Sequence, residues 1–288
     1  MNTQTIEAAR NALRNAPKGV YANNTPKDLT QVFYSEGKYG VSDSLENCAK
    51  AGYQALFIPE LALVRTGAEQ GSEVLTKWYV TPSLRLTGAT KQGSKVVVYS
   101  HIPTEFTKPT NIRNLVENGK LVNGAGPMPQ EEFNSLVSLE GNGRVFVIDY
   151  ERLKGSSSGV ISLEEALDHP QTIPFLGGKD VAEKYLAKHK EVYGNTIGVW
   201  HTDDFKKNNP LGRVLYLGDF NGGLGGVSSL DYSGRVFGVA PEAQSSGVAL
   251  DPYRSPAPLE SRVELSKGGR ILRHEGKTYI LAPDGLEL

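Results

Sequence analysis

The hydrophobic positions of this chain repeat with two periods, which predict helices in some segments and strands in others. A helix is expected to begin from Ser42 or Ser44 as its N-cap and to stop at Gly52. The helical period also runs through residues 3–16, 111–117, 130–139 and 180–193, with a small helix from residue 163. Runs of β-branched and aromatic residues predict strands at 73–80, 84–90, 95–100, 145–149, 197–200, 213–217 and 235–239.

The order of these elements predicts the class of the fold. Segments 84–90 and 95–100 are separated by a short turn, so the two strands must be antiparallel. Helices stand between strands in the middle of the chain, and hairpins are expected near both ends. We therefore expect an α+β protein with a mixed, largely antiparallel β-sheet packed with helices and a β-rich C-terminal third.

The composition changes near the C-terminus. Residues 244–260 are mostly polar and contain three prolines, which predicts a surface loop or linker. It would connect a mixed α/β core at 1–243, built as one domain or as two closely packed halves, to a C-terminal β-meander at 261–288. We expect that meander, with turns at 268–269 and 275–276, to pack on the core.

A short sequence, glycine followed by arginine and then valine or isoleucine, occurs four times. It begins at Gly143, Gly212, Gly234 and Gly269. Glycine would supply a turn, and the β-branched residue would begin a strand. The spacings are irregular, so the pattern indicates turn chemistry and no repeat array.

Composition and charge exclude several classes of protein. The 288 residues include 39% hydrophobic and 22% charged residues, which is typical of globular domains. The formal net charge is −1 with both signs mixed, so nucleic acid is not expected as a partner. Cys48 is the only cysteine, which excludes an intrachain disulfide. No apolar run could span a bilayer and residues 1–14 are polar, so we expect no membrane association and a cytoplasmic location.

Ionisable residues follow four of the predicted strands. They are His101, Asp149, the group of His201, Asp203 and Asp204, and Asp219. If these strands share a sheet and a direction, their carboxyl ends would gather imidazoles and carboxylates at one edge. His201, Asp203 and Asp219 would then be catalytic, and His101, His201 and Asp204 could hold a divalent metal. The alternative is that these residues only form turns and helix caps, as aspartate commonly does.

Two glycine-containing segments are further candidates. Gly222, Gly223 and Gly225 lie in a glycine-rich stretch whose backbone could approach a phosphate or a sugar of a cofactor or ligand closely. A loop between strands explains that stretch equally. Residues 155–159 match the G-x-S-x-G pattern of serine hydrolases, but residues 151–154 stand between them and the preceding strand, whereas the motif requires a strand that runs directly into the serine.

One stretch resembles a known family. Residues 213–239 contain Gly-Asp-Phe-Asn-Gly-Gly and then Gly-Arg-Val-Phe-Gly-Val. This stretch resembles the closing β-strands of the formylglycine-generating-enzyme class of C-type-lectin-like folds. It covers 27 of the 288 residues and lacks the arginine- and tryptophan-rich signature of that class, so no residue role is carried over.

Three hypotheses about function follow. The main one is a hydrolase-like enzyme that uses the His/Asp cluster at the strand ends, with or without a metal ion. The alternative is a non-catalytic module that binds a small molecule or a carbohydrate, with stacking faces from Trp200, Tyr216, Phe220 and Tyr232. A third is a structural or interaction protein without a pocket. The sequence leaves the oligomeric state open.

Overall fold

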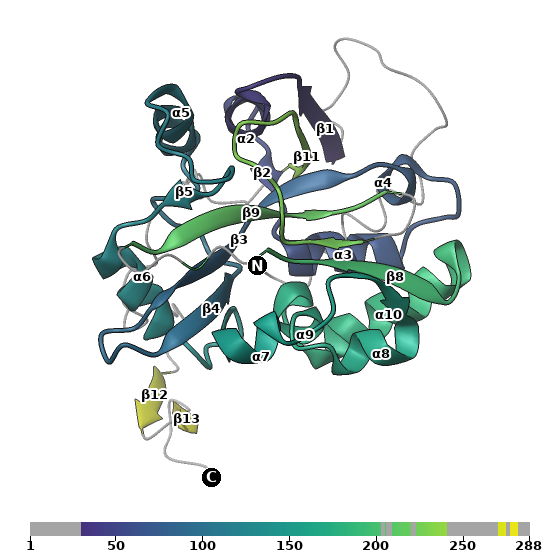
Figure 1. Cartoon of the computed structure of the whole chain (residues 1–288). Helices are drawn as coiled ribbons and strands as arrows, with labels where there is room; N and C mark the ends of the chain where they lie inside the picture. Colours follow the sequence, from purple (N-terminus) through teal and green to yellow (C-terminus); the bar gives the residue numbers. More distant parts are fainter. Residues whose placement is uncertain are drawn as a thin grey trace. The chain divides into compact units, whose positions relative to one another are not determined.

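The computed structural model describes residues 30–202, 205, 209–219 and 223–240, and the strands at 270–274 and 277–281 (Figure 1). Contacts divide the chain into two units, Met1–Tyr253 and Arg254–Leu288. The expected helix at 3–16 and the expected linker at 244–260 lie outside the described residues. The packing of the C-terminal meander on the core stays a prediction.

Helices and strands of the first unit follow the order of the chain. The helices are α2 (Gly40–Lys50), α3 (Ile58–Thr66), α4 (Glu73–Thr76), α5 (Pro109–Glu117), α6 (Gln130–Val137), α7 (Tyr150–Lys154), α8 (Leu163–Asp168), α9 (Thr172–Leu176) and α10 (Lys179–Tyr193). The strands are β1 (Thr30–Ser35), β2 (Gln54–Ala55), β3 (Tyr79–Ala89), β4 (Lys95–Ser100), β5 (Gly126–Pro127), β6 (Val145–Asp149), β7 (Gly159–Ser162), β8 (Thr196–Trp200), β9 (Leu211–Leu217), β10 (Leu224–Gly225) and β11 (Gly234–Val239).

Two sheets organise this unit. The larger has the strand order β6-β4-β3-β9-β10-β8-β7, and β5 also pairs with β9. All of its pairs are antiparallel except β8 with β10, which are parallel. The smaller sheet has the order β1-β11-β2 and is antiparallel. The predicted α+β class with a mixed, largely antiparallel sheet is therefore confirmed.

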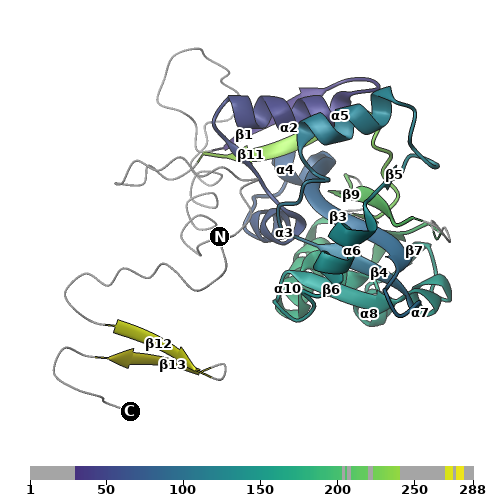
Figure 2. The ribbon, with the colours of Figure 1, turned by 90° about the vertical axis from the view of Figure 1, so that its left-hand side faces the viewer.

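Helices cover the large sheet unequally. Helices α3, α7, α8, α9 and α10 lie along one face, whereas α2 lies with β1 and β11 on the other side (Figures 1 and 2). Each face buries its own apolar cluster. Val97, Tyr99 and Leu215 belong to the first, and Val98, Val214 and Phe133 of α6 belong to the second. Alternate residues of β4 and β9 thus enter opposite cores, as the pleat of a strand requires.

The sequence predicted two strands where the structure has a helix and one long strand. Residues 73–76 form the short helix α4, and β3 runs without interruption from Tyr79 to Ala89. The ladder to β9 shifts register between Val80 and Leu84, so residues 81–83 form a bulge around Pro82. Proline has no N–H to donate to a ladder, and the bulge takes it out of the pairing without ending the strand.

Capping of α2 differs from the expectation. Tyr39 is its N-cap, and Ser42 and Ser44 lie inside the helix, where their hydroxyls donate to the carbonyls of Tyr39 and Val41. Serine inside a helix commonly bonds back to the preceding turn in this way. The predicted stop at Gly52 is confirmed, because Gly52 has a φ of 78°.

The glycines of the Gly-Arg-Val segments have different roles. Gly143 has a φ of 77° and supplies the expected turn. Gly234 is needed for close packing instead, because a Cβ there would lie 2.2 Å from the carbonyl oxygen of Gly40. The expected turn role is therefore wrong at Gly234, where glycine lets β11 approach α2.

The second unit contains the strands β12 (Arg270–His274) and β13 (Lys277–Leu281), which pair antiparallel. This confirms the expected antiparallel pairing, whereas the expected turn at 275–276 lies outside the described residues. Every described element after α10 is a strand, so the C-terminal third is β-rich as predicted. Within the residues described, no helix has the length and apolar character required to cross a membrane.

Candidate functional site

The strand ends that carry the predicted site residues do not meet at one edge. Strands β4 and β6 are antiparallel, with Ser100 opposite Val145 and Val96 opposite Asp149. His101 follows the first strand and Asp149 ends the second, so the two lie at opposite edges of the sheet. The expected gathering required a common strand direction, and the antiparallel pairing removes it.

The same reasoning separates His201 from Asp219. Leu217 of β9 and Val199 of β8 both pair with Leu224 of β10, which brings them level with each other. From that level β8 and β9 run in opposite directions. His201 lies two residues beyond Val199 and Asp219 lies two residues beyond Leu217, so the two side chains lie apart. Four residues along a strand correspond to about 13 Å. These two residues therefore do not form one acid–base pair.

His101 is fully buried and has both ring nitrogens engaged. Its Nδ1 lies 3.0 Å from Ser83 Oγ, and its Nε2 lies 2.8 Å from the carbonyl oxygen of Pro174, to which it donates. Burial lowers the pKa of His101 to about 3. The imidazole is thus neutral and joins the bulge of β3 to α9, which leaves neither nitrogen for a metal ion.

Other predicted residues have structural roles or lie outside the described part. Asp149 is the N-cap of α7, and its side chain accepts a hydrogen bond from the Arg152 backbone N–H at 3.1 Å. The alternative interpretation of the strand-end aspartates is therefore correct for Asp149. Asp203, Asp204, Phe220 and Gly222 lie outside the described residues, and their expected roles stay predictions.

His201 contacts the serine-rich loop that follows α7. Its Nε2 lies 3.3 Å from Ser156 Oγ, and its backbone N–H and carbonyl both bond to Ser158 Oγ. His169, the C-cap residue of α8, packs its ring 5.9 Å from the His201 ring. His169 donates through Nε2 to the carbonyl of Ser157 at 2.8 Å. The histidines thus join two loops that are distant in sequence.

The hydrogen bond between Ser156 and His201 has the wrong polarity for nucleophilic catalysis. The Ser156 hydroxyl donates to the carbonyl oxygen of Leu153 at 2.5 Å, so its proton is not directed at the imidazole. His201 must therefore donate through Nε2, whereas a general base would accept there. Burial, together with the charges of Arg85 and His169, lowers the pKa of His201 to about 4.

Buried polar side chains hold the loops after β8, β9 and β10 through main-chain carbonyls. Arg85 donates to the carbonyl of Thr202 at 2.7 Å, and Gln171 donates to those of Trp200 and Leu224. Arg213 donates to the carbonyls of Val227, Ser228 and Asn123, and Arg65 donates to that of Gly218. These four side chains are 3% exposed or less. A carbonyl is present whatever the residue, so this support does not depend on the loop side chains.

Glycines of the glycine-rich stretch lie against the rings of Trp200 and Tyr216. A Cβ at Gly198 would lie 2.4 Å from Trp200 Nε1, and one at Gly223 would lie 3.5 Å from the same atom. A Cβ at Gly225 would lie 2.1 Å from the ring of Tyr216. Gly225 pairs with Tyr216 on one side and with Trp200 on the other, so all three share one face of the sheet. We call Trp200, Gly225 and Tyr216 the aromatic strip.

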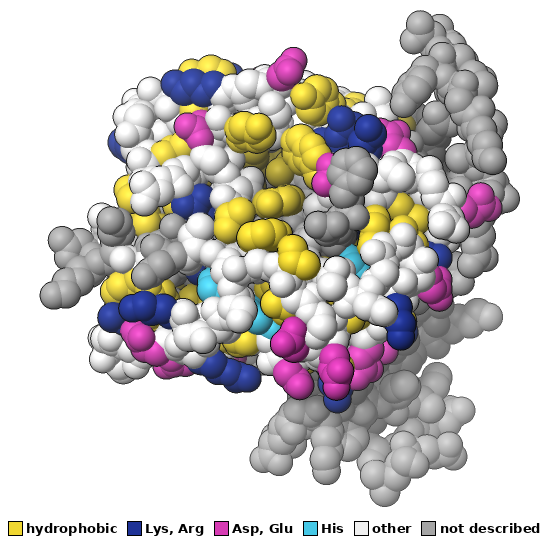
Figure 3. Space-filling view, turned by 45° about the vertical axis from the view of Figure 1, so that its right-hand side comes forward, with side chains coloured by type: hydrophobic (Ala, Val, Ile, Leu, Met, Phe, Trp, Pro, Cys, Tyr) yellow, Lys and Arg dark blue, Asp and Glu magenta, His cyan; other side chains and the backbone are white. Residues whose placement is uncertain are grey.

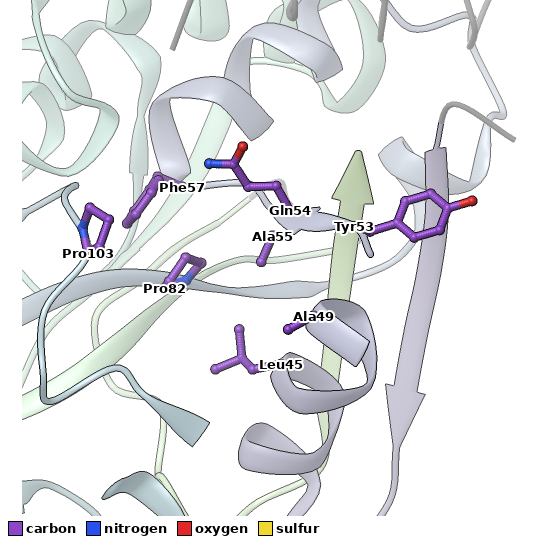
Figure 4. Close-up of a pocket in the computed structure, with 8 residues that line it drawn as sticks. All are labelled: Leu45, Ala49, Tyr53, Gln54, Ala55, Phe57, Pro82 and Pro103. Atoms are coloured by element: carbon purple, nitrogen blue, oxygen red, sulfur yellow. The ribbon is translucent and has the colours of Figure 1, made fainter. Parts of the chain in front are cut away.

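The described part of the chain includes two hollows that bear on a ligand site. The first encloses about 20 Å³ between α2, β2 and the bulge of β3, and Figure 4 shows its lining residues: Leu45, Ala49, Tyr53, Gln54, Ala55, Phe57, Pro82 and Pro103. That space holds about one water molecule and no ligand. The second encloses about 190 Å³ beside His201 and is lined by Arg85, Tyr150, Leu153, Lys154, Ser156, Ser158, His201 and Thr202.

Comparison with known proteins identifies the family. No protein-family model matches this chain, and no curated protein matches it. One solved structure is 49% identical to this chain in sequence. It shows how the C-type lectin fold accommodates massive sequence variation in Nanoarchaeota. The likeness covers 73% of this chain and 97% of the other, with a TM-score of 0.68. This chain belongs to that family of C-type-lectin-fold proteins.

The family and the geometry correct the main functional hypothesis. A hydrolase with a His/Asp cluster is wrong, because the C-type-lectin-fold relative is a variable protein and His101, Asp149, His201 and Asp219, the predicted residues that the structure describes, do not converge. Among the residues that the structure describes, no group of three His, Cys, Asp or Glu side chains could hold a metal ion. The predicted set of His101, His201 and Asp204 accordingly finds no support as a metal site.

Sequence reasoning missed the side chains that hold the loops. Arg85 and Arg213 each stand inside an otherwise uncharged strand, and that isolated charge was the available signal. A buried charged residue requires partners, so each should have been expected to reach polar groups beyond its own strand. Gln171 offered no signal, because a single glutamine after His-Pro is ordinary loop chemistry.

Proposed function

We propose that this C-type-lectin-fold protein is a non-catalytic binding module whose recognition surface is built around the aromatic strip. The observation that carries the proposal is the main-chain support of the surrounding loops. Arg85, Gln171 and Arg213 hold loop carbonyls from inside the protein, so the exposed loop side chains are free for recognition. The relative's fold accommodates massive sequence variation, and such support would let this chain do the same.

The aromatic strip suits a ligand with a flat apolar face. Trp200 is 39% exposed although the edge of its ring rests on the backbone of Gly198 and Gly223. Tyr216 continues the strip. Burial raises the pKa of Tyr216, and the negative charge of nearby Asp219 raises it further. Figure 3 shows hydrophobic side chains gathered on one face with histidine side chains beside them. An aromatic ring next to a carboxylate could stack on a sugar ring and accept from its hydroxyls, so we infer a carbohydrate-like ligand.

Intrinsic fluorescence tests this proposal, because the chain has two tryptophans. Trp78→Phe leaves Trp200 as the single emitter. Titration of that variant with a panel of methyl glycosides and short oligosaccharides should shift the emission and protect it from acrylamide. Trp200→Ala should abolish binding measured by calorimetry, and Trp78→Phe should leave it unchanged. Failure of the whole panel would overturn the carbohydrate assignment, and turnover of a glycoside would overturn the non-catalytic one.

A further inference from the structure

The hollow beside His201 is separate from the aromatic strip. Arg85 and Arg213 pair across β3 and β9 and therefore share a face, whereas Tyr216 lies on the other face with Val80. Tyr150 and Leu153 belong to the core of the Arg85 face. The hollow consequently opens on the helical side of the sheet, and any ligand in it would not touch Tyr216.

The charged groups at the hollow are cationic. Arg85 and Lys154 line it, and its lining among the described residues includes no carboxylate. Lys154 Nζ lies 5.9 Å from the centre of the Tyr150 ring, and Lys95 Nζ lies 5.7 Å from the same ring. Lys95 is 3.7 Å from Glu151, whereas no described carboxylate forms an ion pair with Lys154. Lys154 is exposed and can turn its ammonium group toward a bound anion.

The remaining wall is apolar and partly aromatic. Tyr150 and Leu153 are both at most 4% exposed, and the Tyr150 ring lies 5.1 Å from that of Phe205. The hydroxyls of Ser156 and Ser158 donate to the carbonyls of Leu153 and His201, so their protons are already used. The hollow thus offers a ring-sized apolar wall and cationic groups, while its neutral polar groups are engaged with the protein.

We propose that this hollow binds a small aromatic acid, with the ring against Tyr150 and Leu153 and the carboxylate or phosphate toward Lys154. Its volume of about 190 Å³ admits a single ring and is smaller than the pockets that hold drug-sized ligands. An apolar wall next to a cation selects this class over a neutral ring, which would leave the ammonium without a counterion, and over an inorganic anion, which would leave the wall unused.

His201 supplies a reporter that does not depend on affinity alone. Its imidazole is neutral at pH 7 because burial and the positive charges of Arg85 and His169 lower its pKa. An anion placed in the hollow would offset those charges and raise the pKa of His201. Histidines that do not line the hollow, such as His189, would keep their pKa and serve as internal controls.

Calorimetry and proton NMR of the full chain test the proposal, with benzoate, phenyl phosphate, inorganic phosphate and benzylamine as probes. Benzoate or phenyl phosphate should bind, raise the pKa of His201 and leave that of His189 unchanged. Lys154→Gln should weaken binding roughly tenfold, equal to about 1.4 kcal/mol. Lys184→Gln, which removes the same charge from an exposed pair with Asp180, should not.

Three results would overturn the proposal. One is the absence of binding by either aromatic acid at 10 mM or so, well above the weak affinities expected of ligands of this size. Another is binding of benzylamine or inorganic phosphate as tight as that of benzoate. The last is an equal effect of Lys154→Gln and Lys184→Gln. None of these results bears on the fluorescence of Trp200, so the proposed recognition surface is tested independently.

Discussion

Individual residues at the edge of the large sheet have roles set by their partners. His201 illustrates this, because its sequence context suggested a base or a metal ligand. In the folded chain it donates to Ser156, while burial and the charges of Arg85 and His169 favour the neutral imidazole. The same residue type at the same sequence position could support catalysis only if its partners were acidic.

The stability of the protein is expected to fall in acid through His201. The pKa of His201 is about 4 in the folded chain, below its ordinary value of 6.5. The unfolded state therefore binds more protons between these values, and the free energy of unfolding decreases as the pH falls through that window. Solvent screening at this partly exposed ring leaves an expected contribution of about 1–2 kcal/mol.

Urea unfolding of the wild type and of His201→Gln, between pH 7 and pH 4.5, measures this contribution. The variant should lose less stability than the wild type over this range, since His101, His169 and His189 titrate in both proteins. Parallel stability profiles for the two proteins would contradict the assignment of acid sensitivity to His201.

At the scale of elements, loops are held in place from within the protein. The side chain of Arg213, in β9, donates hydrogen bonds to the carbonyls of Val227, Ser228 and Asn123. The segment after β10 and the segment before β5 are thereby joined by one guanidinium group. Its five donors in a planar fork make arginine suited to this role.

Arg213→Met is expected to destabilise the protein by about 2–4 kcal/mol, because three partly buried carbonyls would lose their donor. Ser228→Ala changes the same loop but leaves its backbone in place, and it should change the free energy of unfolding by less than about 0.5 kcal/mol. Chemical unfolding curves of both variants provide the measurement. A Ser228→Ala effect as large as that of Arg213→Met would mean that loop side chains and not carbonyls maintain the loop.

The whole molecule combines a mixed sheet with two separate cores, and its described residues offer no metal-binding cluster. His101 shows why the whole fold decides this point. The bulge of β3 and the carbonyl of Pro174 in α9 occupy both of its nitrogens, although the sequence placed it at a strand end as a possible ligand.

Chelation is therefore expected to leave the melting temperature unchanged. A ligand that binds only the folded state raises stability in proportion to its occupancy, so a resident metal would show itself on removal. Thermal unfolding with EDTA, and with excess Ca²⁺ or Zn²⁺, should agree with the untreated protein within about 1 °C. A shift of several degrees in either direction would show a metal site that the described residues do not form.

The local elements can largely be predicted from the sequence. Strands 95–100 and 145–149 were predicted at their observed bounds. The helix predicted at 180–193 begins one residue earlier, at Lys179. These predictions succeeded because a strand buried on both faces is a continuous run of β-branched and aromatic residues, and a helix that buries one face repeats its apolar residues with the helical period. Both patterns are local. The α+β class followed from their order, since a short turn permits only an antiparallel pair.

The candidate site depends on contacts between strands that are distant in the sequence. Strand direction in the large sheet sends His201 and Asp219 apart, and pairing across β10 brings Trp200 and Tyr216 onto one face. The bulge at Pro82 likewise depends on β9, which lies more than 120 residues further along the chain. Such relations depend on contacts between distant segments, which the local pattern of apolar and polar residues does not encode.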